Sequence, residues 1–418
     1  MAPHKAMHTW SFIGLMLGAL MGLIFAIAYR FMFTFQMTVP WCLSLAALWV
    51  SLLWIGSLTF GTYFCISTPL ASIPWAIQPI TLFGVFGLEF LVVSFNAAVA
   101  CLLLGESKAA KVFFIVLTLW LIVSVLQYLS YVPTKYATIA VISGPVPTRE
   151  QPYTSATNDM WYKAKLIASR AQTEAIVFPE KWFFVPVTPA ENAPQKCAAS
   201  FASEVRNRLP DAPTVVSGCR TSGYGNFAAS VFSDGTVQIY GKRRPMILQG
   251  EKSRYRTEQG IFKLVKNRHD SPFYAPLICY DLDFPSTVEA ALTPSPGHTA
   301  NIILSPSEDW SGVRDHYLVS VIRAIEFRVA IARADGGFNS AVIAPSGQLY
   351  FHHQTYDSTV NSQIVEVPVG DGKRSLFAII GVYTFPIICL AAVALLLLLE
   401  FIFYFFGIVN VAFPGNRV

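Results

Sequence analysis

The stretch that decides the fold reads Pro276-Leu277-Ile278-Cys279-Tyr280-Asp281-Leu282-Asp283. A short apolar run closes at a cysteine, and polar residues follow it at once. This pattern is typical of a strand whose end opens onto a cleft, because α/β domains present reactive groups at the ends of their strands. A structural cysteine would more often lie inside the apolar run, so Cys279 is a candidate nucleophile.

Short apolar runs on both sides of this stretch alternate with amphipathic stretches. The expected strands are 138–143, 175–178, 228–232, 276–280, 302–305 and 340–343. The expected helices are 159–172, 191–208 and 315–328. Strands that alternate with helices predict a layered α/β domain.

The charged residues divide the chain into three parts. Only 13% of the 418 residues are charged, against about 25% in an average soluble domain. Residues 1–133 carry six charges and residues 375–418 carry two, so the other 47 lie in residues 134–374. We expect transmembrane helices in 1–133, a catalytic domain in 134–374 and a last transmembrane helix in 375–418.

Fifty-eight uncharged residues separate Arg30 from Glu89, more than one crossing needs, since about 20 apolar residues span the hydrocarbon. A cleaved signal peptide is the competing interpretation of the first 30 residues, but its apolar run is long for one. The Lys and Arg residues of the short loops favour neither side of the membrane. The expected spans are 11–29, 38–58, 79–104, 112–132 and 376–399.

Several classes of site are not expected. The net charge of +5 is spread without a long basic run, so nucleic acid is not an expected partner. Cys197 and Cys219 lie on expected surface loops and lack the close spacing of zinc ligands; they form a disulfide if the domain lies outside the cytoplasm, or remain free thiols. We expect no metal and no cofactor.

A cysteine nucleophile needs a base or a nearby cation, because its thiol is mostly protonated at neutral pH. Glu180 follows the strand-like segment 176–179, and Lys242 follows the strand-like segment 236–240. Each of them alone is also typical of a solvated surface residue. His316, which opens an expected helix, is a further candidate base.

The order of Glu180, Lys242 and Cys279 resembles the carbon–nitrogen hydrolase (nitrilase) superfamily, and the flanking sequence resembles its apolipoprotein N-acyltransferase branch. Three features depart from that branch: Asp281 stands where a glutamate is usual, the aromatic-rich motif reads EDWSG at 308–312, and the leading spans are fewer than seven. The segments that carry the resemblance are 178–180 (FPE), 240–251 (YGKRRPMILQGE), 278–281 (ICYD), 305–310 (SPSEDW), 323–326 (RAIE), 333–337 (RADGG) and 84–92 (GVFGLEFLV).

The resemblance implies a membrane α-helical bundle joined to an α/β nitrilase-like αββα sandwich domain. It implies that Glu180 moves protons, that Lys242 stabilises the thiolate and the oxyanion, and that Cys279 holds the acyl group as a thioester. It assigns supporting roles to three further residues, namely Glu251, Tyr280 and Asp281.

The implied activity is that of a membrane N-acyltransferase, which transfers an acyl chain from a glycerophospholipid to the N-terminal amine of a diacylglyceryl-cysteine apolipoprotein. The resemblance places the catalytic domain on the outer face of the cytoplasmic membrane, and we expect a monomer. Two alternatives stay open. One is a membrane-tethered amidase, and the other is a non-catalytic receptor with a hydrolase-like domain.

Overall fold

The computed structural model describes Gly22 and residues 39–103, 105, 107–145, 155–170, 172–185, 192–221, 225–246, 251, 260–266, 268–293, 299–309, 315–354 and 359–405. The chain forms two compact units, which we name the helical unit and the sandwich unit. The helical unit comprises Met1–Ser67, Phe83–Ser124 and Ile380–Val418, and the sandwich unit comprises Thr68–Leu82 and Val125–Ile379. The short segment Thr68–Leu82 thus groups with the sandwich unit, although apolar helices flank it in the sequence.

Long apolar helices make up most of the described part of the helical unit. They are α2 (Val39–Phe60), α3 (Ile80–Leu103), α4 (Ser107–Leu129) and α10 (Thr384–Phe405). Three stretches are long and apolar enough to cross a membrane, namely Cys42–Phe60, Ile80–Leu103 and Ala110–Leu129. These confirm the spans expected at 38–58, 79–104 and 112–132. The span expected at 11–29 lies outside the described residues, apart from Gly22.

The last expected span, 376–399, begins later than the sequence predicted. A short helix, α9 (Leu376–Ile380), ends at Gly381, whose φ of 105° lies in the left-handed region that favours glycine. The chain then enters α10 at Thr384. Within the helical unit, Phe385 of α10 packs edge-on against Phe90 of α3, with ring centroids 5.7 Å apart.

A buried carboxylate lies in the middle of the membrane helices. Glu89 of α3 is fully buried, and its two oxygens accept hydrogen bonds from Trp49 Nε1 at 2.9 Å and from the main-chain N–H of Ser67 at 2.7 Å. An ionisable group within an apolar span needs such partners.

Two mixed β-sheets form the sandwich unit. The larger has the strand order β13-β1-β2-β4-β5-β6 with β3 on β4, and the smaller has the order β12-β11-β10-β9-β8-β7. Five of the expected strands correspond to β1, β2, β5, β9 and β11, whereas the strand expected at 276–280 shares only Pro276 with β8. The bounds are β1 Lys135–Ser143, β2 Ala175–Val177, β3 Phe183–Val185, β4 Thr214–Thr221, β5 Gly225–Val231, β6 Val237–Gly241, β7 Phe262–Lys263, β8 Phe273–Pro276, β9 Ile302–Ser307, β10 Ala330–Asp335, β11 Asn339–Ile343, β12 Leu349–Gln354 and β13 Asn361–Val369.

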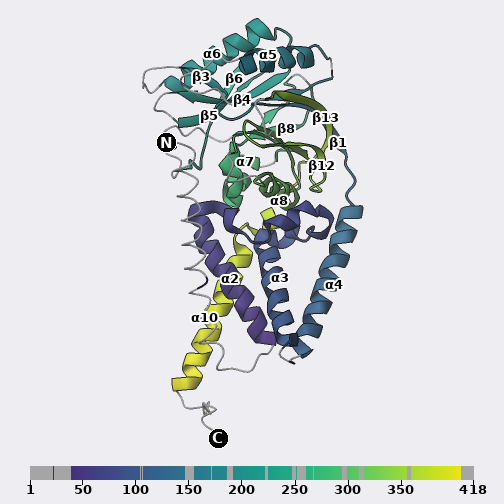
Figure 1. Ribbon diagram of the computed structural model, residues 1–418, viewed down its shortest axis with the longest axis vertical. Coiled ribbons are helices and arrows are strands. Elements are labelled where there is room, and N and C mark those ends of the chain that lie inside the picture. Colours follow the sequence, from purple (N-terminus) through teal and green to yellow (C-terminus); the bar gives the residue numbers. More distant parts are fainter. Residues whose placement is uncertain are drawn as a thin grey trace. The chain divides into compact units, whose positions relative to one another are not determined.

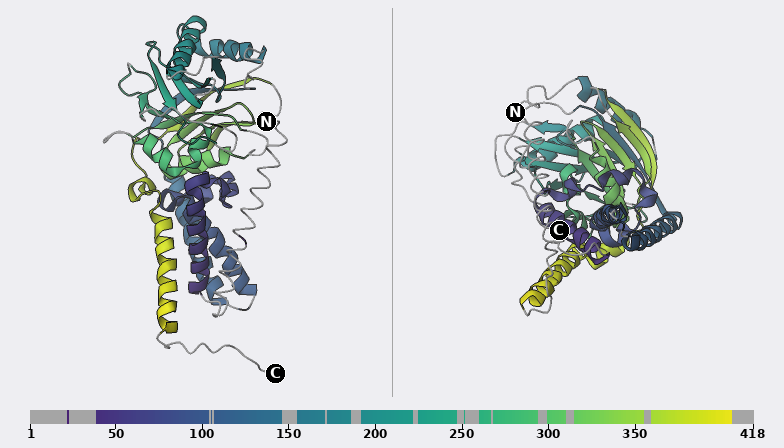
Figure 2. Two further views of the ribbon diagram at one scale, coloured as in Figure 1. Left: turned by 90° about the vertical axis from the view of Figure 1, so that its left-hand side faces the viewer. Right: turned by 60° about the horizontal axis from the view of Figure 1, so that its bottom comes forward.

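Helices cover the outer face of each sheet (Figure 1, Figure 2). Helices α5 (Ser155–Ala168) and α6 (Ala193–Arg208) pack on the larger sheet through a core that includes Trp161, Phe178 and Phe201. A second core, which includes Val141 and Ile302, fills the space between the sheets. Helices α7 (Pro285–Leu292) and α8 (Tyr317–Phe327) contact the smaller sheet. These four layers confirm the expected αββα sandwich.

Candidate active site

The three residues that carry the resemblance all follow strands. Glu180 lies in the turn after β2, and Lys242 directly follows β6. Cys279 comes three residues after β8, and β8 belongs to the smaller sheet whereas β2 and β6 belong to the larger. The main-chain N–H of Glu180 donates to the carbonyl of Ser307 in β9 at 3.1 Å, which ties the turn after β2 to the smaller sheet.

Lys242 lies between two carboxylates. Its Nζ is 2.8 Å from Glu180 Oε1 and 2.8 Å from Glu251 Oε2; Lys242 and Glu180 are buried, and Glu251 is partly buried. Burial by itself lowers the pKa of a lysine, but the charges of Glu180 and Glu251 outweigh it and raise the pKa of Lys242 well above its ordinary value. Lys242 is therefore a fixed ammonium group at neutral pH.

Lys181 supplies a second ammonium group that the sequence analysis did not single out. Its φ of 56° is uncommon for a residue other than glycine. Its Nζ lies 2.7 Å from Glu251 Oε1 and 3.0 Å from Glu308 Oε2. Burial would raise the pKa of Glu251, but Lys242 and Lys181 outweigh that effect and hold the pKa below its usual range. Glu251 is therefore a carboxylate throughout the neutral range.

The two oxygens of Glu180 differ in their surroundings. Oε1 accepts hydrogen bonds from Lys242 and from the side-chain amide of Asn226, which also donates to Glu251 Oε1 at 3.3 Å. Within the described residues, Oε2 is buried and has no hydrogen-bond partner. Buried carboxylate oxygens normally accept a hydrogen bond from a donor. Because Oε2 has no such donor, it can accept a proton from a reactant, as a general base does.

The turn that presents Cys279 is strained and held by Asp281. Cys279 has a φ of 41°, a conformation that costs about 1–3 kcal/mol outside glycine. Asp281 Oδ2 accepts hydrogen bonds from the main-chain N–H of Ile278 at 3.1 Å and from the Tyr240 hydroxyl at 2.9 Å. Its Oδ1 accepts one from the main-chain N–H of Arg244 at 2.7 Å. Asp281 thus joins the cysteine turn to the lysine segment.

The local structure at the cysteine differs from the expected strand over 276–280. Strand β8 ends at Pro276, which has no N–H for a further ladder bond, and Cys279–Asp283 forms a 3₁₀ helix, η5. Tyr280 is nearly buried in it, with its ring edge-on to Phe284 at a centroid distance of 5.3 Å.

Charged groups of both signs act on the Cys279 thiol. Burial raises the pKa of the thiol to about 11, and the negative charge of Glu180 adds to this, whereas His316 and Lys242 oppose it. Of these groups, His316 has a ring nitrogen within 4.8 Å of the Cys279 sulfur. Because the sulfur is a thiol at neutral pH, it has to lose its proton to a base as it attacks.

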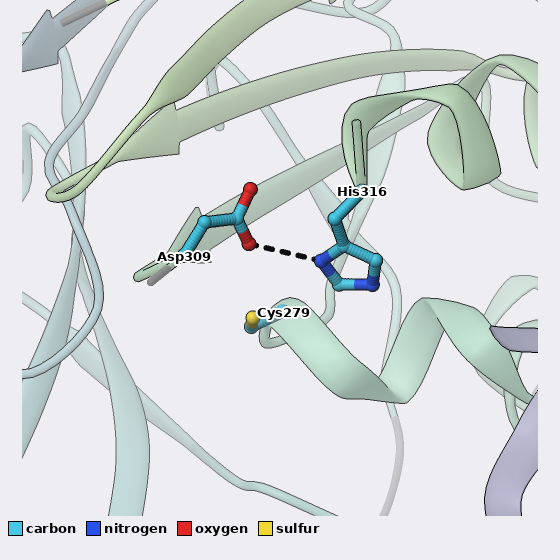
Figure 3. A group of neighbouring side chains, drawn as sticks. All are labelled: Cys279, Asp309 and His316. Carbon is cyan, nitrogen blue, oxygen red and sulfur yellow. Dashed lines mark hydrogen bonds and ion pairs between the residues drawn. The ribbon is translucent and has the colours of Figure 1, made fainter. Parts of the chain in front are cut away.

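His316, which precedes α8, lies between two carboxylates. Its Nε2 is 2.6 Å from Asp283 Oδ2, and its Nδ1 is 2.9 Å from Asp309 Oδ1. Burial lowers the pKa of a histidine, but these two carboxylates outweigh it and raise the pKa of His316 well above its ordinary value. Figure 3 shows Cys279 beside the Asp309–His316 hydrogen bond. An imidazolium has no lone pair, so His316 is a cation near the sulfur and not a base.

The same cluster has the residue types of a metal site, since the ligating atoms of Cys279, Asp309 and His316 lie within 4.8 Å of one another. The donors do not fit a metal. Arg333 binds both oxygens of Asp309, at 2.8 and 2.6 Å, and both ring nitrogens of His316 face carboxylates. A metal ligand has to be a neutral imidazole with a free lone pair, so the cluster is an ion-pair network.

Cys197 and Cys219 lie in the core and not on the expected surface loops. Cys197 is in α6 and Cys219 in β4, both buried and both free thiols. Burial raises the pKa of Cys219 well above its ordinary value, and its contact with Cys197 adds to this. The two side chains are therefore neighbours, and the disulfide stays a prediction.

Charged or polar residues of this site that no sequence pattern singled out include Lys181, Asn226, Asp283 and Asp309. Lys181 and Asp283 are adjacent or nearly adjacent to singled-out residues, and Asp309 falls in a quoted motif. A search for charged residues within these motifs would have found all three. Asn226 has no local signal, because its partners come from other strands.

The chain is similar to known acyltransferases and amidases. It is 25% identical to apolipoprotein N-acyltransferase 2 of Treponema pallidum (strain Nichols), over 75% of this chain and 69% of that protein. This confirms the resemblance to the apolipoprotein N-acyltransferase branch. An amidase from Nesterenkonia sp. has 18% identity, covers 57% of this chain and 94% of its own, and has a TM-score of 0.45. A CN-hydrolase superfamily protein from Xanthomonas campestris has 18% identity, covers 56% and 91%, and has a TM-score of 0.44. No family model matches the chain.

Proposed function

We propose that this protein is an integral-membrane N-acyltransferase that moves an acyl chain from a glycerophospholipid to the N-terminal amine of a diacylglyceryl-cysteine lipoprotein. The observation that carries the proposal is the hydrogen bonding of the two Glu180 carboxylate oxygens. Lys242 and Asn226 donate hydrogen bonds to Oε1. Among the described residues Oε2 is buried and has no hydrogen-bond partner, and the charge of Glu180 raises the pKa of the Cys279 thiol. The similarity to a named apolipoprotein N-acyltransferase supports the choice of acyl chemistry.

In the first half-reaction, the Cys279 sulfur attacks the ester carbonyl of the phospholipid. A carbon–sulfur bond forms, the ester carbon–oxygen bond breaks, and Glu180 carries the thiol proton to the departing lysophospholipid oxygen. The ammonium of Lys242 stabilises the negative charge on the tetrahedral oxygen, aided by the main-chain N–H that follows the cysteine. The product on the enzyme is a thioester at Cys279.

In the second half-reaction, the lipoprotein amine attacks the thioester. A carbon–nitrogen bond forms and the carbon–sulfur bond breaks, while Glu180 takes a proton from the amine and returns it to the sulfur. Glu251 keeps Lys242 in place, and Asp281 keeps the cysteine turn in place. These are positioning residues, because in this scheme they do not touch the reacting atoms.

The membrane helices fit a lipid substrate. Moving an acyl chain of about sixteen carbons from lipid into water costs on the order of 12 kcal/mol, at ~0.8 kcal/mol per CH₂. An enzyme embedded in the bilayer avoids most of this cost. Among the described residues, three helices are long and apolar enough to cross a membrane, which is more than a tether requires. We propose that the protein lies in the cytoplasmic membrane with its sandwich unit on the outer face, acting as a monomer.

Trapping of the thioester tests the proposal. The full-length protein in detergent micelles is incubated with phospholipid labelled in its acyl chains, in the absence of acceptor, and the label on the protein is measured. Wild type is expected to hold label that hydroxylamine releases, and Cys279→Ala is expected to hold none. Cys197→Ala is the matched control, because it removes another buried thiol and leaves Cys279 intact.

Addition of acceptor distinguishes transfer from hydrolysis. A diacylglyceryl-cysteine peptide is expected to discharge the label as an amide-linked acyl peptide. Label that persists on Cys279→Ala would contradict the assignment of the nucleophile. Release of free fatty acid at the same rate with and without peptide would instead establish the membrane-tethered amidase or hydrolase.

A further inference from the structure

A cavity lies within the sandwich unit. It is at the end of α8 opposite to the candidate active site. It has a volume of about 370 Å³, within the range of small-molecule sites. Its lining comes from the segment after α4, from the segment before α9 and from Arg328. The polar lining residues are Ser130, Tyr131, Thr134, Arg328, Asp371, Lys373, Arg374 and Ser375.

The guanidinium of Arg328 meets neutral groups. Its Nη1 donates to Gln78 Oε1 at 2.9 Å and to the carbonyl of Pro345 at 3.4 Å, and it lies 5.9 Å from the centroid of the Tyr131 ring. In the part of the chain that the structure describes, no carboxylate forms an ion pair with it. Burial lowers the pKa of Arg328 to about 10. A half-buried positive charge without a counter-ion is unfavourable, and an anionic ligand would remove that cost.

The other groups around the cavity favour an anion too. Lys373 and Arg374 also line the cavity, but both are paired: Lys373 Nζ lies 3.7 Å from Asp371 Oδ2, and Arg374 Nη2 lies 2.8 Å from Glu289 Oε1. Asp371 is already engaged by the main-chain N–H of Lys373 at 2.9 Å. Burial raises the pKa of Tyr131 to about 12, so its hydroxyl remains a hydrogen-bond donor at neutral pH. The lining is thus rich in donors, and among the described residues Arg328 is its cation without a carboxylate partner.

The position of the cavity in the sequence identifies the source of the anion. Ser130 and Tyr131 directly follow Leu129, which ends one of the candidate spans. Residues at that position lie at the level of the lipid headgroups, where tyrosine is enriched and where lysine and arginine contact anionic lipids. We propose that this cavity binds the phosphate of a membrane phospholipid headgroup.

This lipid is not the acyl donor at the moment of reaction. Helix α8 has His316 at its start, beside Cys279, and Arg328 at its end. Twelve residues of helix at 1.5 Å each separate the two by roughly 18 Å. A phosphate held by Arg328 is therefore too far from Cys279 for its own glycerol esters to reach the sulfur. The site would hold a resident lipid that fixes the sandwich unit to the headgroup layer.

Native mass spectrometry of the full-length protein in detergent tests this site without recourse to activity. The protein is titrated with phosphatidylglycerol, with diacylglycerol and with inorganic phosphate. We expect phosphatidylglycerol adducts on wild type, and weakening by about tenfold or more in Arg328→Gln, the loss of one charge-assisted hydrogen bond. Arg206→Gln is the matched control, because Arg206 is an exposed arginine on α6.

A third variant separates charge from folding. Arg328→Lys keeps the cation, so it should retain most of the phosphatidylglycerol binding that Arg328→Gln loses, and the melting temperatures of both variants check that they fold. Equal losses in Arg328→Lys and Arg328→Gln would overturn the proposal. So would diacylglycerol adducts as abundant as those of phosphatidylglycerol. Inorganic phosphate that binds Arg328 as tightly as the lipid would overturn the assignment to a lipid headgroup.

Discussion

The ammonium group of Lys181 lies 2.7 Å from Glu251 Oε1, while Lys242 lies 2.8 Å from the other oxygen of the same carboxylate. Glu251 is thus held from both sides by lysines from different segments. Because Lys242 also contacts Glu180, a change in the charge of Glu251 would alter the position of Lys242 and its interaction with Glu180. Lys181 is therefore a positioning residue of the proposed reaction.

Replacement of Lys181 should alter the pH dependence of acyl transfer. Lys181→Met removes a positive charge that lies 2.7 Å from Glu251 Oε1 and 3.9 Å from Glu180 Oε1. Loss of a nearby cation favours the protonated form of a carboxyl group, so the acidic limb of kcat/KM should move up by about one pH unit. Lys181→Arg should keep the wild-type limb. The measurement is the pH profile of acyl-peptide formation. A uniform loss at every pH, with the limb unmoved, would indicate a structural role alone.

Removal of the carboxyl charge of Glu180 should slow both half-reactions. Glu180→Gln keeps the shape of the side chain but cannot accept a proton, so turnover should fall by about 10² to 10⁴-fold. Glu251→Gln should lower turnover less, since Glu251 acts through Lys242. Single-turnover labelling measures the first half-reaction in each variant. A Glu251→Gln defect larger than that of Glu180→Gln would reverse the roles given to these two residues.

A methyl group at Gly218 should displace Glu180 without touching the reactants. A Cβ at this position would lie 2.4 Å from the Cα of Glu180 and 2.7 Å from the N of Lys181. Neither backbone atom can move aside cheaply. A displacement of about 1 Å is enough to cost roughly 10²-fold in rate, so Gly218→Ala should lose activity to about that extent.

The control for this substitution is Gly56→Ala in α2, because nothing lies within 4 Å of a Cβ at Gly56. Its activity should remain near that of wild type. Wild-type kcat/KM in Gly218→Ala would mean that the turn after β2 does not set the position of the carboxylate.

His316 should stabilise the fold most strongly at low pH. Its pKa is raised in the folded state, so its contribution is fully present below the unfolded value of about 6.5 and is lost as pH rises through the folded value. His316→Gln replaces the positive partner of the buried carboxylates Asp283 and Asp309 with a neutral one. The free energy of unfolding should fall by about 3–5 kcal/mol. Thermal unfolding of both proteins in detergent from pH 5.5 to 9 measures the difference. A gap that widens with rising pH would contradict a positively charged His316.

Much of the architecture was accessible from local sequence. The spans at 38–58, 79–104 and 112–132 follow from the length of uncharged apolar runs, which is a local property. The predicted start of the last helix was wrong, because Gly381 adopts a left-handed conformation inside an otherwise continuous apolar run. The strand expected through Cys279 was wrong because its apolar run bends at the cysteine into η5.

The candidate site was accessible only in part. Motif order singled out Glu180, Lys242 and Cys279, and the fold places Lys242 2.8 Å from Glu180. The assignment of the three as a catalytic triad stays a prediction. Asn226 was missed because its partners Glu180 and Glu251 come from other segments of the chain. Lys181 was missed although it directly follows Glu180 in the sequence.

The sequence by itself determined which residues are apolar enough to cross a membrane and in what order the reactive side chains occur. Tertiary structure decided their charge. His316 is an imidazolium because Asp283 and Asp309 reach it from other elements, and Glu251 is a carboxylate because two lysines reach it. The pKa of a group depends on burial and on charges within a few ångströms, and for residues distant in the chain those distances exist only after folding.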